Sequence, residues 1–293
     1  MVDWPSYNRS LVRRGEILFS YDFLDSWGSE IEKMNKNKKG KPFVFPNSFI
    51  LVIGYIRTSF RLPYRQTEGI INATGKRLPA NPSYGHICKR INKLNINIKK
   101  DKIVDDDLII SIDSTGIKVT NRGQWMDEKW ITQNRKGYLK IHVAVNIKTK
   151  EILALEVTDE KVHDGKILKK LVNNVLDNQD MKKIKSVLAD GAYDSNTNFK
   201  YLQEKKITTA IKVRRNSIVS TKNSRLRNRE VRLQTKDLLK WKKKRKYGHR
   251  WIAETAFSSI KRMFGEYTSV TRFQNMVKEM MIKVSLYNLF RRI

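Results

Sequence analysis

The chain has 293 residues, with 60 Lys or Arg against 29 Asp or Glu, and its formal net charge is +31. Because such a surface repels itself, it favours a polyanion as partner, and nucleic acid is the leading candidate ahead of an anionic membrane surface. The single cysteine, Cys88, excludes an intramolecular disulfide and a zinc site built from cysteines. The opening residues MVDWPSYNRSLVRR lack the apolar run of a secretory signal, so we expect a cytoplasmic protein.

Residues 1–104 are predicted to form a helical N-terminal DNA-binding region, because their apolar positions recur at helical spacing. The most apolar stretch, FVFPNSFILVIGYI at 43–56, is too short for a membrane span and is interrupted by Pro46 and Asn47. We therefore expect a buried helix there and no membrane contact.

Two further segments of this region, RQTEGIINATG and SYGHICKRINKL, are typical of a helix, a turn and a second helix. Ser83 is placed to cap the second helix, and in one interpretation Lys89, Arg90 and Lys93 face a phosphate backbone. The turn is longer than in a standard helix-turn-helix, so a DNA-reading unit and an ordinary helical hairpin are equal alternatives.

The periodicity changes at Asp105, where a predicted catalytic domain of 105–293 begins. Runs of β-branched and alternating apolar residues predict strands, and one amphipathic run predicts a helix. In chain order these are strands at 108–114, 137–146 and 151–159, a helix at 163–178 and a strand within 185–194. We expect the first and fourth strands each to end on a carboxylate, Asp113 and Asp190.

Residues 205–246 form a separate block, with seventeen basic residues and two acidic ones. A segment so polar supplies little core, so we predict a basic insertion on the surface of the catalytic domain. Within it, TTAIKV and REVRLQTK are interpreted as strands and the rest as loop. Its end carries five consecutive cations that we expect to bind DNA: Lys242, Lys243, Lys244, Arg245 and Lys246.

Residues 247–264 are predicted to form one helix with two distinct faces. At about 100° per residue, the apolar arc contains Ile252, Ala253, Ala256, Ile260, Met263 and Phe264. The four polar side chains that share a face outside this arc are Tyr247, Arg250, Glu254 and Lys261. In one interpretation Arg250 and Glu254 make an ordinary surface salt bridge. In the other, Glu254 is a functional carboxylate.

Three carboxylates that converge from two strands and a helix form a site for hard divalent cations, because Mg²⁺ prefers oxygen ligands. Two such ions activate the attacking oxygen and stabilise the leaving oxygen in phosphoryl transfer, while basic neighbours neutralise the nucleic acid. We therefore interpret Asp113, Asp190 and Glu254 as catalytic and metal-binding residues.

The polar face of the helix matches the pattern Tyr-x2-Arg-x3-Glu-x6-Lys, and the blocks IDSTGIKV and LADGAYDS carry the two aspartates. In these motifs and their order, residues 105–267 resemble the DDE transposases of prokaryotic insertion sequences, families four and five of that classification. The resemblance implies an α/β fold. In it, a helical N-terminal domain precedes a ribonuclease-H-like catalytic domain, which is a mixed five-stranded sheet flanked by helices.

The same resemblance implies that the three carboxylates form a triad that holds two Mg²⁺ or Mn²⁺ ions. It also implies that the terminal phosphates of the DNA are held by Tyr247, Arg250 and Lys261. It implies a DNA transposase that cleaves the terminal inverted repeats of an element and joins the 3′-hydroxyls to target DNA, as a homodimer in a synaptic complex. Two alternatives stay open: a metal-dependent nuclease without strand transfer, and an inactive DNA-binding derivative.

Several other residues have simpler interpretations. We expect Asp164 to add favourable charge at a helix N-terminus, His142 to be a satisfied strand histidine and Asp194 to shape a turn. Core packing and base stacking are equal alternatives for three tryptophans, Trp125, Trp130 and Trp241. The closing segment MVKEMMIKVSLYNLF is predicted to be a packed helix that contributes to the core rather than to a dimer surface.

Overall fold

The structure is a computed structural model that describes residues 3–74, 78–96, 98, 108–119, 138–178 and 183–293. The chain divides into two compact units. The first consists of residues 1–97 with 263–265 and 269–293, and the second of residues 98–262 with 266–268. The predicted boundary at 104 lies outside the described residues. The closing helix, which we expected within 105–293, groups with the N-terminal residues.

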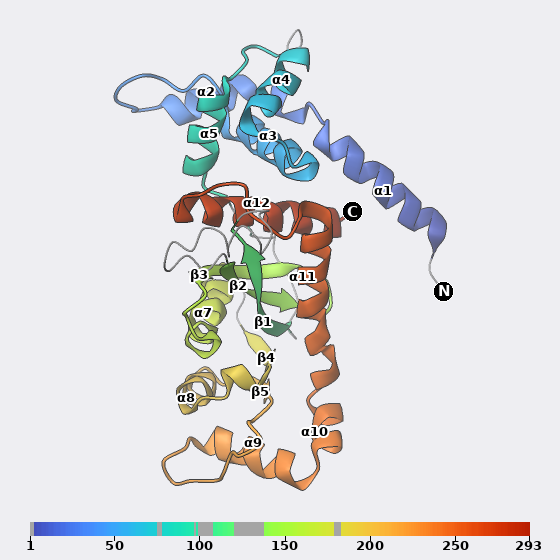
Figure 1. Ribbon diagram of the computed structural model, residues 1–293, viewed down its shortest axis with the longest axis vertical. Helices are drawn as coiled ribbons and strands as arrows, with labels where there is room; N and C mark the ends of the chain where they lie inside the picture. The colour runs from blue at the N-terminus through green and yellow to red at the C-terminus, as the bar shows by residue number, and fades with distance from the viewer. Residues whose placement is uncertain (1–2, 75–77, 97, 99–107, 120–137, 179–182) are drawn as a thin grey trace, which may run out of the picture. The chain divides into compact units, whose positions relative to one another are not determined.

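The first unit is helical (Figure 1). Its elements are α1 (Trp4–Leu18), the 3-10 turn η1 (Asp22–Leu24), α2 (Trp27–Asn35), α3 (Asn47–Phe60), α4 (Tyr64–Thr74), α5 (Tyr84–Lys93) and α12 (Phe273–Arg291). Helix α3 begins directly after Pro46 and fully buries Ile50 and Ile53, which confirms a buried helix in the apolar stretch. No described helix is long and apolar enough to cross a membrane.

Helices α4 and α5 confirm the predicted helix pair. Ser83 Oγ caps α5 by accepting a hydrogen bond from His86 N. The Arg90 guanidinium stacks on the ring of Phe43 at 4.6 Å, so this cation has a packing role within the unit. Helix α12 contacts α3 and α5 and buries Ile282 in their apolar cluster, which confirms the packed closing helix.

The second unit is built on a mixed five-stranded sheet. Its strands are β1 (Leu108–Lys118), β2 (Tyr138–Asn146), β3 (Ile152–Asp159), β4 (Ile184–Ala189) and β5 (Thr208–Ile211), in the spatial order β3-β2-β1-β4-β5. The β1–β2 and β2–β3 pairs are antiparallel, whereas β1–β4 and β4–β5 are parallel. This is the ribonuclease-H-like arrangement, and it confirms the predicted fold class.

Helices cover both faces of this sheet (Figure 1). On one face, α7 (Leu168–Asn178) and α8 (Asn196–Glu204) share an apolar cluster with the strands, because α7 presents four apolar residues at helical spacing. These fully buried residues are Leu168, Leu171, Val172 and Val175. On the other face lies α11 (Trp251–Phe264), whose predicted apolar arc is buried except at half-buried Met263.

Two element boundaries differ from the prediction. Strand β1 continues past residue 114 because it pairs with β2 along its second half, up to Lys118 opposite Tyr138. Asp113 therefore lies in the middle of β1 and not at its end. The helix expected from residue 247 begins at Trp251. Residues Tyr247–Arg250 form a 3-10 turn, η5, after Lys246, whose positive φ of 52° interrupts the helical path.

The basic segment also differs from the prediction. Residues 208–211 confirm the strand expected in TTAIKV, but they form the fifth strand of the sheet and not part of a surface insertion; residues 229–236, interpreted as a strand, are helical. Helix α9 (Arg225–Lys236) is capped by Ser224, and α10 (Leu238–Lys244) is capped by Asp237. The segment supplies six buried apolar side chains, those of Ile207, Ala210, Ile211, Leu226, Val231 and Trp241.

Candidate active site

Three residues of β1 face η5 and α11, because side chains alternate along a strand. Ser111 Oγ donates a hydrogen bond to the carbonyl oxygen of Arg250 at 3.0 Å, and Thr115 Oγ1 accepts one from Lys261 Nζ at 3.0 Å. Between them, Asp113 Oδ2 accepts a hydrogen bond from Arg250 Nη1 at 3.0 Å. One face of the strand therefore contacts two of the four polar residues that the sequence placed on one helix face.

The two aspartates come from neighbouring parallel strands. Strands β1 and β4 pair as far as Ser111 and Leu188, and each aspartate lies two residues farther along its own strand. Because paired strands lie about 4.8 Å apart, this register brings Asp113 and Asp190 close together. Asp190 directly follows β4, as predicted, and its Oδ1 accepts a hydrogen bond from Ala192 N at 2.9 Å in the 3-10 turn η4 (Gly191–Tyr193).

Glu254 lies in the first turn of α11 and is linked to Asp113 through one cation. Arg250 pairs through Nη2 with Glu254 Oε1 and through Nη1 with Asp113 Oδ2. The helix-surface salt bridge considered for Arg250 and Glu254 therefore forms, but the same guanidinium also binds an aspartate that is distant in sequence. The Asp113 side chain is 15% exposed and that of Glu254 is 53% exposed, so the linked carboxylates reach from the interior to the surface.

The pKa values of Asp113 and Arg250 are set by burial and by the charges of their neighbours. Burial raises the pKa of Asp113, and repulsion from Asp190 and Glu254 adds to the rise, while the Ser114 N–H and Arg250 oppose it. For Arg250, burial alone would lower the pKa, but attraction to Asp113 and Glu254 raises it above its ordinary value. The site therefore combines crowded carboxylates with one permanently charged counter-ion.

Two concave surfaces adjoin these residues. The first is lined by Asp113, Ser114, Thr115, Glu254, Phe257, Ser258, Lys261, Arg262 and Glu266. The second is lined by Lys242, Lys243, Lys246, Tyr247, Gly248, His249, Arg250 and Trp251. The four residues of the sequence motif are thus divided between the two surfaces, with Glu254 and Lys261 in the first and Tyr247 and Arg250 in the second.

The five cations predicted to bind DNA do not all have the same environment. Lys242, Lys243 and Lys246 line the second concave surface, and Lys244 is exposed on α10. Arg245 is mostly buried and pairs with Glu230, which has no exposed surface. Its guanidinium is therefore part of the packing between α9 and α10.

A polar cluster lies on the α7 side of the sheet, and two of its members, Asp164 and His142, were interpreted from the sequence separately and not as a cluster. Asp164 opens the 3-10 turn η3 (Asp164–Lys166) and pairs with Lys140 Nζ at 2.5 Å, so it does more than add charge at a helix end. His142 Nδ1 lies 3.8 Å from Asp164 Oδ1. Burial and the nearby carboxylates raise the pKa of the Tyr193 phenol. The recurrence of Lys140 and His142 on one strand face was the only sequence signal of this cluster.

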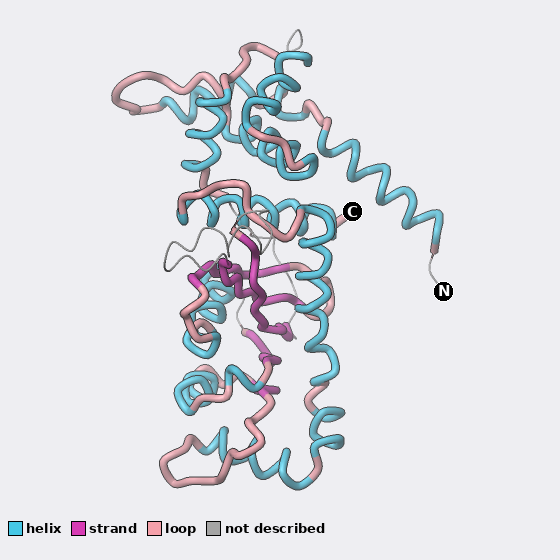
Figure 2. Tube along the Cα trace, viewed as in Figure 1, coloured by secondary structure: helices cyan, strands magenta, loops and turns pink. Residues whose placement is uncertain are grey.

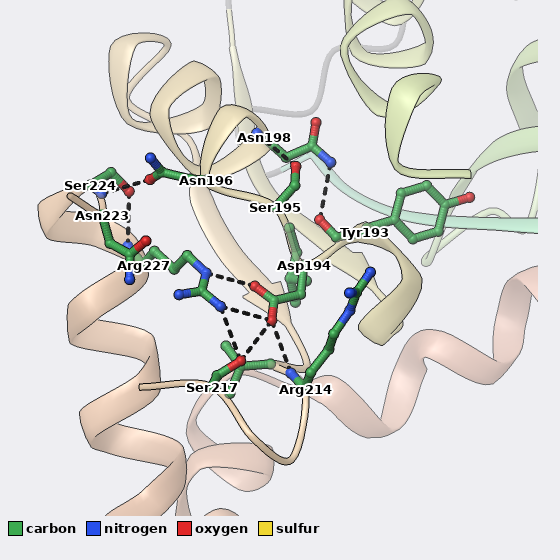
Figure 3. Close-up of polar contacts among 12 residues, drawn as sticks. Tyr193, Asp194, Ser195, Asn196, Asn198, Arg214, Ser217, Asn223, Ser224 and Arg227 are labelled. Carbon is green, nitrogen blue, oxygen red and sulfur yellow. Dashed lines mark hydrogen bonds and ion pairs between the residues drawn. The ribbon is translucent and has the colours of Figure 1, made fainter. Parts of the chain in front are cut away.

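Asp194 is a buried ion-pair partner and not only a turn residue. Its carboxylate has no exposed surface and pairs with Arg227 Nε at 2.8 Å (Figure 3). Trp241 belongs to the core, because it is 3% exposed and its Nε1 donates a hydrogen bond to Glu230 Oε2 at 2.7 Å. Trp125 and Trp130 lie outside the described residues.

The three carboxylates are the type of donor that suits Mg²⁺ or Mn²⁺, which prefer oxygen ligands. Among the described residues, no three His, Cys, Asp or Glu side chains lie at the spacing of a metal site. Arg250 instead supplies the positive charge between Asp113 and Glu254. A divalent cation shared by these two carboxylates would take the place of the guanidinium.

Comparison with known proteins adds to this geometry. A family model described as a transposase DDE domain matches residues 105–289, and a second model with the same description matches residues 12–122. Among solved structures, the chain is similar to a piggyBac transposase in a synaptic complex with hairpin DNA. The sequences are 11% identical, the TM-score is 0.44, and the match covers 94% of this chain and 73% of that chain.

Two further solved structures are similar at lower TM-scores. For a pre-cleavage Mos1 transpososome, the identity is 8%, the TM-score is 0.32, and the match covers 87% of this chain and 78% of that chain. For a Drosophila P element transposase in a strand transfer complex, the identity is 14%, the TM-score is 0.33, and the match covers 63% of this chain and 41% of that chain. The first family model covers more than half of the chain and includes all three candidate carboxylates. This protein therefore belongs to the DDE transposase family.

Proposed function

We propose that this protein cleaves the ends of an insertion sequence and joins the resulting 3′-hydroxyls to target DNA. The observation that supports this most is the arrangement of the carboxylates. Asp113 and Asp190 come from neighbouring parallel strands, and Glu254 is linked to Asp113 through Arg250. A protein that only binds DNA gains nothing from crowding anions beside a surface that must accept phosphates.

We propose that Asp113, Asp190 and Glu254 together hold two divalent cations, Mg²⁺ or Mn²⁺. When bound, such ions supply the activation of a water or 3′-hydroxyl oxygen and the stabilisation of the leaving oxygen. The protein's own part is to position the DNA. With cations bound at Asp113 and Glu254, the Arg250 guanidinium would be free to hold a phosphate through two parallel hydrogen bonds.

The other motif residues are positioned to bind the DNA end in this proposal. Lys261 is held on the first concave surface by its hydrogen bond to Thr115. Tyr247 lies on the second surface with three lysines of the basic segment. Double-stranded DNA is therefore the proposed partner, as terminal inverted repeats and as target. Because an element has two ends that join one target, we also propose a homodimer in a synaptic complex.

The proposal is tested with a supercoiled plasmid that carries the native element ends, with and without Mg²⁺. Wild type is compared with Glu254→Gln, which keeps the shape of the side chain and removes its charge. Glu266→Gln is the matched control, because Glu266 lines the same concave surface. We expect metal-dependent cleaved and joined products from wild type and from Glu266→Gln, and neither product from Glu254→Gln.

Other outcomes identify the alternatives. Metal-dependent cutting without joined products would indicate a nuclease. Tight DNA binding with no metal-dependent product from wild type would indicate an inactive derivative. Equal activity of Glu254→Gln and wild type would remove Glu254 from the proposed triad.

A further inference from the structure

The connection between β5 and α9, residues 212–224, has no regular secondary structure (Figure 2) but is fixed by polar contacts. Its first half is held by the fully buried carboxylate of Asp194. This carboxylate accepts hydrogen bonds from Arg214 N at 2.9 Å, Ser217 Oγ at 2.9 Å, and Arg227 Nε and Nη2 at 2.8 and 3.1 Å (Figure 3). Charge-assisted bonds of this kind are stronger than neutral ones, so they define the loop conformation.

The second half of the loop is held by two asparagines from the flanking helices. Asn228 of α9 accepts from Ser220 N at 3.1 Å and donates to Ser220 O at 2.8 Å. Asn196 of α8 donates to Lys222 O at 3.0 Å and accepts from Ser224 N at 2.7 Å. The backbone is thus anchored on both sides of its central residues, which lowers the entropy cost of binding a partner in this conformation.

The loop presents two apolar side chains between basic ones. Ile218 is 73% exposed and Val219 is 42% exposed. Arg214 and Arg215 on one side, and Lys222 on the other, are exposed as well. Two adjacent β-branched residues contribute little to the core at these exposures, so their side chains are available for contact with a partner.

We propose that this loop enters the minor groove of duplex DNA, with Ile218 and Val219 against the base edges and the flanking cations on the phosphates. Apolar wedges beside Arg or Lys are the means by which many proteins bind that groove. The wider major groove admits a helix or a ribbon, whereas two adjacent side chains of a loop suit the narrower one. The positive flanks match the charge of the DNA backbone.

This inference rests on the proposed function, because it takes DNA as the substrate. It adds that the groove contact and the proposed carboxylates are held at a fixed spacing along the duplex. Asp194 anchors the loop and lies four residues after Asp190, on the far side of turn η4. A loop bound in the groove therefore sets the distance along the duplex at which the proposed carboxylates meet a phosphate.

The test measures binding of the full-length protein to a fluorescein-labelled A·T-rich duplex without divalent metal, over a series of salt concentrations. We expect the double variant Ile218→Ser/Val219→Ser to bind at least about tenfold more weakly at every salt concentration, because burial of one such side chain accounts for that factor. The slope of log affinity against log salt should stay unchanged. In contrast, Arg214→Ala/Arg215→Ala should make that slope shallower by about two.

Matched controls exist for both changes. Leu239→Ser removes another exposed apolar side chain, 77% exposed on α10, and should leave the affinity unchanged. Lys169→Ala/Lys170→Ala removes two exposed cations from α7 and should leave the slope nearly unchanged. Circular dichroism of each variant establishes that it is folded. A competing minor-groove ligand, netropsin, should weaken wild-type binding more than binding of the Ile218→Ser/Val219→Ser variant.

The outcomes separate this inference from the proposed function. The loop contact is overturned if the Ile218→Ser/Val219→Ser variant binds DNA with wild-type affinity, or if Leu239→Ser loses as much affinity as that variant. The proposed reaction still stands in either case if cleavage persists. Equal competition by netropsin in wild type and variant would overturn the minor-groove assignment. A protein that binds through the loop but gives no metal-dependent products would retain this inference and lose the proposed reaction.

Discussion

Nη1 of Arg250 lies 3.0 Å from Oδ2 of Asp113, although the two residues are 137 positions apart in the sequence. The other end of the same guanidinium pairs with Glu254. One cation therefore balances two of the carboxylates that we propose as metal ligands. In the proposed function, divalent ions would compete with Arg250 for the same oxygens, so Arg250 would be available to a phosphate only when metal is bound.

Replacing Arg250 with Ala should tighten Mn²⁺ binding to the DNA-free protein by about tenfold, because it removes a positive charge beside two carboxylates. The affinity is measured by electron paramagnetic resonance of free Mn²⁺. Arg262→Ala removes an exposed cation from the concave surface that Asp113 and Glu254 line, and it should have a much smaller effect. Weaker Mn²⁺ binding by the Arg250 variant would mean that Arg250 organises the carboxylates and does not compete with the metal.

Asp194→Asn should lower the free energy of unfolding by about 3 kcal/mol at neutral pH, because it leaves the mostly buried Arg227 guanidinium without its compensating negative charge. Burial would raise the pKa of Asp194, but hydrogen bonds from Arg227, Arg214 N and Ser217 bring it below its ordinary value. A depressed folded-state pKa stabilises the fold above the unfolded pKa of about 3.9, and this contribution is lost as the pH falls through the folded-state pKa.

Urea unfolding at a series of pH values checks this prediction. The stability difference between wild type and Asp194→Asn should be full at neutral pH and should shrink as the solution becomes acidic. Glu204→Gln, a change at the exposed end of α8, provides the control and should differ little from wild type at any pH. A difference that is small at neutral pH would contradict a stabilising role for the buried carboxylate.

His142 should make the protein less stable as the pH falls from about 6.5 to about 4. Burial lowers the pKa of this histidine to about 4, with Asp164 opposing the shift and Lys140 adding to it. Across this range the unfolded chain takes up a proton that the folded chain does not, so stability is present above the unfolded pKa and is lost below it, by up to about 3 kcal/mol.

The variant His142→Gln removes this titration and retains a polar group near Thr158, with which His142 Nε2 shares a hydrogen bond of 3.0 Å. The stability difference between wild type and variant should therefore narrow on acidification. Thermal unfolding followed by circular dichroism at several pH values measures it. A constant difference between neutral and mildly acidic pH would show that the pKa of His142 is the same in the folded and unfolded states.

Two glycine substitutions should have opposite effects. A Cβ on Gly165 would lie 3.1 Å from the carbonyl oxygen of Ala192, in the turn that holds Asp190, so Gly165→Ala should cost about 1–2 kcal/mol and reduce DNA cleavage. Gly69 is exposed within α4 and has no atom within 4 Å of the added Cβ. Gly69→Ala should stabilise the protein by about 0.5–1 kcal/mol, because alanine loses less backbone entropy in a helix. Calorimetry of both variants shows whether each substitution raises or lowers the stability of the protein.

The catalytic half of the fold was accessible from the sequence because its signals are local. Alternating β-branched residues predict the strands, and helical spacing places Arg250 and Glu254 on one face. That pairing persists although Arg250 lies in a 3-10 turn, since Arg250 ends that turn directly before α11 begins. The register that brings Asp113 beside Asp190 depends on the pairing of distant strands, which no local pattern specifies.

The basic segment was predicted less well because its core includes polar residues. Composition suggested a surface insertion, yet Glu230 and Gln234 of α9 are buried and take part in its packing. Asp194 and Arg227 are 33 residues apart, and Asp164 and Lys140 belong to different elements. Ion pairs between such distant residues depend on tertiary packing, so turn chemistry and charge at a helix end were the only interpretations that the sequence supported.

The two acidic residues of the basic segment have a consequence for the free protein. Glu230 is buried beside Trp241 and paired with Arg245, and Asp237 caps α10, so the two acidic residues leave most of the seventeen cations of the segment without a balancing charge. In the absence of a polyanion, mutual repulsion among those cations strains the segment, and dissolved salt relieves that strain by screening. Salt should therefore act with opposite signs on the two states: it stabilises the isolated chain while it releases the chain from nucleic acid.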